Sequence, residues 1–140
     1  MRSANPRSRA RSWVLQVMYG WDMAGDGSIR EWARQALQGR NVSPRYRPYI
    51  DRVLSALDLG LPECDRRIEA SMPTWRVGRL SAIDRNILRI GTVEMMAMED
   101  VPHRVAIHEA IRLAERYGSD DSPGFVNGVL DAVGRQISSS

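Results

Sequence analysis

The chain has 140 residues, of which 43% are apolar and 26% are charged, values typical of one ordinary globular domain. Its single cysteine, Cys64, excludes an internal disulfide and favours a reducing, cytoplasmic setting. The first eleven residues contain no apolar run, so neither a signal peptide nor a membrane span is expected there.

The positive charge is concentrated at the start of the chain. All twenty basic residues are arginine. Four of them precede the first acidic residue, Asp22: Arg2, Arg7, Arg9 and Arg11. In the rest of the chain the carboxylates outnumber the arginines by one, so the net charge of +3 comes from a basic arm, residues 1–11. Such an arm is typical of a segment that binds a polyanion, although a solvated, disordered tail has the same composition.

Four helices are predicted in the first half of the chain, over about 8–24, 28–38, 43–60 and 62–71, because apolar residues recur there at three- and four-residue steps. Ser28 is a suitable cap for the second helix. Pro44 suits the first turn of the third helix, whose start Pro48 could delay. Gly60 is expected to end that helix and Pro62 to open the fourth.

Three further helices are predicted in the second half. Ser81 begins the first of them, with Asp84 as the acidic residue of a capping box. This helix is apolar over most of its circumference, which indicates central burial. The next helix follows Pro102 and stops at Gly118, and the last begins at about Ser122. No segment alternates with a period of two, so the expected fold is all-α, with about seven helices packed as bundles.

No catalytic, cofactor or metal site is expected. His103 and His108 have no second histidine or cysteine at metal-ligand spacing, and no glycine-rich phosphate loop is present. Cys64 lies between two acidic residues, a poor setting for a reactive thiolate. The acidic pairs at 99–100 and 120–121 fall at helix junctions, where interaction with a helix start is the favoured interpretation. The chain is therefore predicted not to be an enzyme.

The basic arm and two aromatic residues are the candidates for binding RNA. On a helix Arg7 and Arg11 would share a face, and Arg9 would lie about 200° from Arg7. Four phosphate contacts would give single-stranded RNA a log–log salt slope of roughly −3. Tyr117 and Phe125 could stack on unpaired bases, although core packing is the simpler explanation for both.

The sequence also resembles the NusB transcription antitermination family. In its second half the matching positions are Trp75, Arg79-Leu80, Ile83-Asp84-Arg85, Ile87-Leu88-Arg89-Ile90, Glu94, Val101-Pro102, Val105-Ala106-Ile107, Glu109-Ala110, Leu113-Ala114 and the run Phe125-Val126-Asn127-Gly128-Val129-Leu130-Asp131. The N-terminal arginines, Gln16, Tyr19 and Trp21 also match, whereas residues 28–60 match only in helical pattern.

This resemblance implies a single domain, 1–140, in which the basic arm is followed by two helical sub-bundles, 12–75 and 76–138. It also implies binding of the boxA element of ribosomal RNA transcripts together with the ribosomal protein NusE, within an antitermination complex on the elongating RNA polymerase. The implied RNA contacts are Arg7, Arg9, Arg11, Gln16, Tyr117, Asp121 and Phe125. The implied NusE contacts are Tyr19, Met23 and Asp84.

Two other interpretations stay open at this point. The first is an accessory RNA-binding domain of a ribosomal RNA methyltransferase, which the lack of a methyl-donor fold disfavours. The second is a protein-only scaffold or homodimer that buries the basic arm against a second copy. The sequence departs from the resemblance at Ser8, which interrupts the basic run and is expected to weaken RNA binding.

Overall fold

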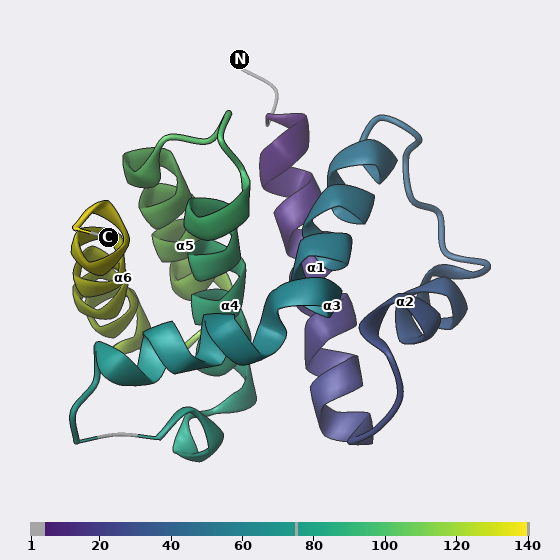
Figure 1. The fold of residues 1–140 in the computed structure, drawn as a ribbon. Coiled ribbons are helices and arrows are strands. Elements are labelled where there is room, and N and C mark those ends of the chain that lie inside the picture. The colour runs from purple at the N-terminus through teal and green to yellow at the C-terminus, as the bar shows by residue number, and fades with distance from the viewer. Residues whose placement is uncertain (1–4, 75, 140) are drawn as a thin grey trace.

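The computed structural model describes residues 5–74 and 76–139, so Arg2 and Trp75, both considered above, lie outside the described residues. Within these ranges the chain forms six α-helices and one short 3₁₀ turn, and no strand (Figure 1). The elements are α1 (Pro6–Ala24), α2 (Ile29–Leu37), α3 (Arg47–Ala70), η1 (Val77–Arg79), α4 (Ala82–Ala97), α5 (His103–Tyr117) and α6 (Ser122–Ser138). The all-α prediction is confirmed.

Side-chain caps fix where several helices begin. The side chain of Asn5 accepts a hydrogen bond of 2.8 Å from the Arg7 amide and starts α1. Ser28 and Ser81 cap α2 and α4 in the same way, at 2.9 and 3.1 Å from the amide three residues later. Both serine caps were predicted, because a hydroxyl can satisfy an amide that has no partner within the helix. At the other end of α1, Gly25 takes the left-handed conformation, with φ of 87°, that closes a helix.

Helix α3 differs from the prediction. Two helices were expected, separated at Gly60, but the structure has one element that bends at this residue, where φ is −118° and ψ is 15°. Gly60 leaves the helical conformation without reversing the chain. Pro62 then stands in the first turn after the bend, where the missing amide donor costs little. The predicted break at Gly60 is confirmed as a kink, and the two expected helices are two limbs of α3, so the structure has six α-helices and not about seven.

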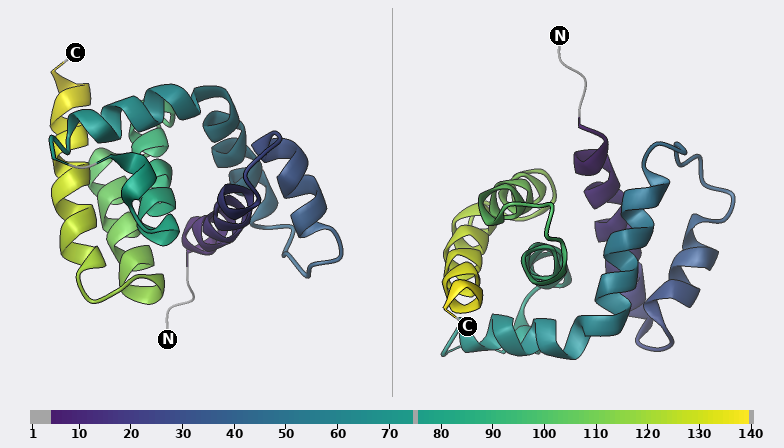
Figure 2. Two further views of the ribbon diagram at one scale, coloured as in Figure 1. Left: turned by 90° about the horizontal axis from the view of Figure 1, so that it is seen from below. Right: turned by 45° about the horizontal axis from the view of Figure 1, so that its top comes forward.

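The two limbs of α3 lie in different parts of the molecule. The first limb packs with α1 and α2, and the second crosses beneath α4 and α6 (Figures 1 and 2). Contacts of the second limb include a hydrogen bond of 3.3 Å from the Arg67 guanidinium to Gln136 and the burial of Cys64 against the carbonyl of Arg89. The packing of α3 thus runs across the sub-bundle boundary expected at residue 75.

Helix α4 is the centre of one continuous hydrophobic core. Its residues 86–95 are all buried, as its apolar sequence predicted. Gly91 lets α6 approach closely, because a Cβ atom at this position would lie 2.6 Å from Leu130 Cδ1. No helix of the described residues is long and apolar enough to cross a membrane.

A polar network joins the end of α1 to α4. Asp22 accepts hydrogen bonds from Arg85 at 2.7 Å and Asn86 at 2.9 Å, and it lies 3.3 Å from the guanidinium of Arg89. Arg89 in turn makes a two-pronged ion pair with Asp65 of α3. Burial opposes ionisation of Asp22, but the hydrogen bonds from Arg85 and Asn86 keep the pKa of this carboxyl below its usual value. The network fixes α1, and hence the basic arm at its other end, against the rest of the molecule.

Candidate RNA interface

The basic arm is not a loose tail beyond Asn5: it forms the first turns of α1, which lie between α3 and α5 (Figure 1). Because successive residues on a helix are 100° apart, Arg9 points away from Arg7 and Arg11, as predicted. Arg9 faces α5, whereas Arg7 and Arg11 both approach Tyr49 of α3. Arg7 is partly exposed there and Arg11 is buried in the core.

Arg9 lines a groove between α1 and α5 with a volume of about 490 Å³, which we call the α1–α5 groove. Its α1 wall carries Arg9, Trp13 and Gln16, which share one helical face at spacings of four and three residues. Its α5 wall includes Arg116 and Tyr117. The structure therefore brings together Arg9, Gln16 and Tyr117, three of the predicted RNA-binding residues.

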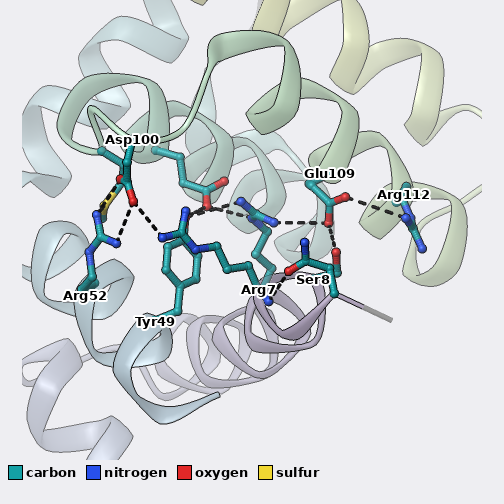
Figure 3. Close-up of polar contacts among 11 residues, drawn as sticks. Arg7, Ser8, Tyr49, Arg52, Asp100, Glu109 and Arg112 are labelled. Carbon is teal, nitrogen blue, oxygen red and sulfur yellow. Dashed lines mark hydrogen bonds and ion pairs between the residues drawn. The ribbon is translucent and has the colours of Figure 1, made fainter. Parts of the chain in front are cut away.

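The charges of this groove favour an anionic ligand. Three of its lining side chains are arginines and two are glutamates: Arg9, Arg112, Arg116, Glu109 and Glu115. Glu109 is already engaged, because Ser8 donates to it at 2.6 Å and the guanidinium of Arg112 lies 3.8 Å away (Figure 3). Among the described residues no ion pair engages Arg9 or Arg116. These two guanidinium groups are available to phosphate.

Aromatic rings line the same groove. The Arg116 guanidinium lies 5.5 Å from the centre of the half-buried Tyr117 ring, and Arg40 lies 5.2 Å from the Trp13 ring. Tyr46 completes this aromatic set. Proteins that bind single-stranded nucleic acids commonly have aromatic rings beside cationic groups, because bases stack on the rings while phosphates pair with the cations.

Arg7 lies on the opposite side of α1, over the ring of Tyr49 at 4.6 Å from its centre. Its guanidinium pairs with Asp100 at 2.7 Å, and Arg52 of α3 pairs with the same carboxylate at 2.8 Å (Figure 3). The hydrogen bonds from Arg52 and Arg7 hold the pKa of Asp100 well below its usual range. Asp100 was expected to act at a helix start, and the structure shows instead that it bridges two arginines.

Arg11 is the predicted RNA contact that the structure places differently, since only 3% of it is exposed. Its guanidinium lies 2.8 Å from Glu94 and 3.3 Å from Glu109, and the Tyr49 hydroxyl also donates to Glu94. Burial raises the pKa of Glu94 despite the opposing charge of Arg11. In this conformation Arg11 faces carboxylates, not solvent, so its observed role is to fix α1 on α4.

The other two predicted RNA contacts lie at the junction of α5 and α6. Asp121 is exposed immediately before α6, and Phe125 is half-buried in its first turn, packed on the core. Neither lines the α1–α5 groove. Both follow the groove residue Tyr117 closely in sequence, so this junction adjoins the end of the groove.

The predicted protein-contact residues occupy the far end of α1 and the start of α4. Tyr19 and Met23 are one helical turn apart, and their exposed fractions of 41% and 64% are high for large apolar side chains. Asp84 is partly buried and accepts a hydrogen bond of 2.7 Å from Ser122. Asp22 links the α1 segment to Arg85, the neighbour of Asp84. Asp84 therefore also holds α6 to α4.

Four aromatic or basic residues of the groove were not predicted as RNA contacts: Trp13, Tyr46, Arg112 and Arg116. A usable signal existed for three of them. Trp13 lies one turn after Arg9, and Arg112 and Arg116 are one turn apart on α5, so each extends a basic helical face. The position of Tyr46 depends on how α3 packs against α1, which local spacing does not reveal. The described residues contain no cluster of acidic, histidine or cysteine side chains that could hold a metal ion.

The sequence of this chain matches the model of the NusB family over residues 8–135. The chain belongs to the NusB family. It is 33% identical to the transcription antitermination protein NusB of Desulfosudis oleivorans over 136 residues, which cover 96% of this chain and 88% of that protein.

Solved structures of NusB proteins have the same fold. The NusB of T. maritima superimposes with a TM-score of 0.83 at 30% identity, over 96% of this chain and 94% of that one. A chain from a crystal structure of antitermination factors NusB and NusE in complex with double-stranded RNA gives a TM-score of 0.83 at 24% identity, covering 94% of this chain and 97% of that one. At this last identity the likeness concerns the fold alone. The relatives and the fold agree with a NusB-type helical protein.

Proposed function

We propose that this chain is a transcription antitermination factor that binds boxA-type single-stranded RNA of ribosomal RNA transcripts together with the ribosomal protein NusE. The single observation that supports RNA binding best is the α1–α5 groove, where arginines without an ion-pair partner lie beside half-buried aromatic rings. Membership of a family of transcription antitermination proteins supports the process in which the RNA is bound.

Within this proposal the groove residues divide into two roles. Arg9 and Arg116 contact backbone phosphates, because their guanidinium groups have no carboxylate partner among the described residues. Tyr117 and Trp13 stack on bases, and Gln16 supplies a side-chain amide for a base edge. Asp121 and Phe125 extend the contact to the start of α6. Arg11 acts indirectly, by fixing the angle of α1.

The proposed NusE surface consists of Tyr19, Met23 and Asp84. A NusB–NusE–RNA assembly exists in a structural relative of the same fold, which supports a protein partner that binds beside the RNA. Tyr19 and Met23 provide the exposed apolar area that such an interface needs. The assembled unit would join the elongating RNA polymerase, which places the chain in the cytoplasm.

A homodimer is the second candidate. A copy packed over the basic arm would cover the α1–α5 groove and hide Arg9 from RNA. This alternative predicts that RNA binding weakens as the protein concentration rises, whereas a monomeric adaptor shows no such dependence.

The test is a fluorescence-anisotropy titration of boxA-like and scrambled single-stranded RNA, with and without NusE, over a series of salt concentrations. We expect weak binding of the boxA-like RNA alone and tighter binding with NusE. Equal affinity for both RNAs, unchanged by NusE, would contradict the proposal.

Variants test which surface binds RNA and which binds NusE. Arg9→Gln with Arg116→Gln should reduce the magnitude of the log–log salt slope by about 1.4, since each lost phosphate contact contributes about 0.7. The matched control is Arg66→Gln, an exposed arginine on the distant limb of α3 that pairs with Glu63. Met23→Ala should leave binding of RNA alone unchanged and reduce only the gain from NusE.

A further inference from the structure

A second basic site lies beside the start of α1, on the side away from the α1–α5 groove. It is a cavity of about 530 Å³ between the first turns of α1 and α3, and we call it the basic pocket. Arg7 of α1, Arg45 of the preceding turn and Arg52 of α3 line it around Tyr49. Three arginines from three separate segments thus line one cavity.

The basic pocket has more positive charge than its surroundings neutralise. Asp100 is the carboxylate that pairs with Arg7 and Arg52 there, at 2.7 and 2.8 Å. No ion pair or side-chain hydrogen bond engages the guanidinium of Arg45 within residues 5–74 and 76–139. Glu94, which accepts a hydrogen bond from the Tyr49 hydroxyl, is fully buried and is paired with Arg11. The pocket therefore carries two uncompensated positive charges.

Asp100 has the position of a replaceable ligand. Its side chain is 48% exposed and bridges two guanidinium groups that are themselves 39% and 44% exposed (Figure 3). A phosphate diester has two non-bridging oxygens that share one negative charge, and these can pair with two arginines in the same way. Because all three partners reach solvent, a phosphate can take the place of the carboxylate without unfolding any element.

We propose that the basic pocket binds a backbone phosphate of the RNA strand whose neighbouring nucleotides occupy the α1–α5 groove. This inference rests on the proposed function, and it adds Arg45 and Arg52 to the RNA contacts. Arg7 and Arg9 are two residues apart on opposite faces of α1, so one strand that crosses the first turn of α1 reaches both sites. This continuity favours RNA over an acidic peptide as the occupant.

The chemistry of the basic pocket predicts how it recognises the strand. Tyr49 is buried, and the guanidinium groups of Arg7 and Arg52 already lie over its ring at 4.6 and 5.4 Å. With only 5% of Tyr49 exposed, its ring offers a base little surface on which to stack. The basic pocket is therefore expected to recognise the phosphate charge and not the base sequence, in contrast to the α1–α5 groove.

The experiment compares a short boxA-like RNA with the same RNA extended by uridines of increasing length at either end. Binding of the full chain is measured by anisotropy at several salt concentrations. We expect an extension at one end to raise affinity once it reaches the basic pocket, and to increase the magnitude of the salt slope by about 0.7. Replacing the uridines by cytidines should preserve this gain.

Three variants test whether the gain in affinity from the extension arises at the basic pocket. Arg45→Gln and Arg52→Gln should each reduce it several-fold while leaving affinity for the short RNA unchanged, and Arg66→Gln should change neither. Asp100→Asn should increase affinity for the extended RNA, because it removes a negative charge and releases two guanidinium groups. A purely structural role for Asp100 predicts the opposite sign.

The outcomes separate this inference from the proposed function. Failure of the short RNA to bind would overturn the proposed function and this inference with it. Normal binding of the short RNA, with an extension gain that is absent or insensitive to Arg45→Gln and Arg52→Gln, would overturn this inference alone. Polyglutamate that competes with the extension as well as polyuridine does, with the same dependence on Arg45, would reassign the basic pocket to acidic protein segments.

Discussion

Tyr49 contacts two ion-pair networks that have similar chemistry and different surroundings. Its hydroxyl donates to the buried network, in which Arg11 pairs with Glu94 at 2.8 Å and both are almost fully enclosed. Its ring contacts the exposed network, in which Arg7 and Arg52 share Asp100 at 2.7 and 2.8 Å (Figure 3). The distances are nearly equal, so the difference between the networks lies in solvent access.

Solvent access decides what each network can do. A buried pair cannot exchange partners with water or ligand, and removal of one member leaves an uncompensated charge in the interior. An exposed pair contributes little to stability because water and salt screen it. The buried network therefore fixes α1 on α4, whereas the exposed network is free to exchange its carboxylate for another anion.

The largest expected effect comes from breaking the buried network. Glu94→Ala leaves the Arg11 charge buried without its closest partner, and we expect it to lower the free energy of unfolding by about 3–5 kcal/mol. Urea unfolding followed by circular dichroism measures this loss.

A double replacement is the control. Arg11→Met with Glu94→Met removes both charges and fills the space with apolar side chains, so it should be more stable than either single variant. Losses that simply add in the double variant would show that the pair itself contributes nothing.

The two networks also show what the sequence can predict. The serine caps at Ser28 and Ser81 were predictable because capping depends on residues within one turn. The divergence of Arg9 from Arg7 was predictable from helix geometry alone. The burial of Arg11 was not, because its partner Glu94 lies 83 residues away and meets it only after α1 packs on α4.

Site prediction failed for the same physical reason elsewhere. Asp100 was taken for a helix-start residue because its sequence neighbours suggest that, whereas its observed partners Arg7 and Arg52 come from two other helices. The break at Gly60 was predictable from local signals, but the packing of the next limb of α3 on α4 and α6 was not. The groove residue Tyr46 likewise depends on tertiary packing.

A smaller loss of stability is expected from Tyr49→Phe, which removes the contact of this residue with the buried network and keeps its contact with the exposed network. The variant removes the hydroxyl that donates to Glu94 and keeps the ring on which Arg7 and Arg52 lie. The loss in unfolding free energy should be about 1–3 kcal/mol, the cost of a buried acceptor that loses its donor. Affinity for RNA should stay at the parent value. Reduced RNA affinity in a fully folded variant would show that the Tyr49 hydroxyl also contributes to RNA binding.

The networks should respond to pH with opposite signs. Arg52 and Arg7 lower the pKa of Asp100, so its contribution to stability is complete above the unfolded value of about 4 and is lost as the pH falls below it. Burial raises the pKa of Glu94, so the folded chain retains this proton longer than the unfolded chain does. Glu94 therefore makes stability decrease as the pH rises from about 4.3 through its raised pKa.

Urea unfolding at a series of pH values checks both signs. Asp100→Asn should flatten the acid side of the stability profile, and Glu94→Gln should flatten the decrease on its higher-pH side. The same change of slope in both variants would contradict the assignment of opposite shifts.

The smallest effect on folding is expected from Arg52→Gln. Asp100 keeps Arg7 as a partner in this variant, and the Arg52 side chain is 44% exposed, so little desolvation or packing changes. The urea midpoint should stay within error of the parent, at low salt as well as at high salt. Since the same variant is expected to weaken binding of the extended RNA, an unchanged midpoint would assign that loss to the surface and not to the fold. A clear loss of stability would instead make the exposed network structural, and the contrast between the buried and the exposed network would no longer hold.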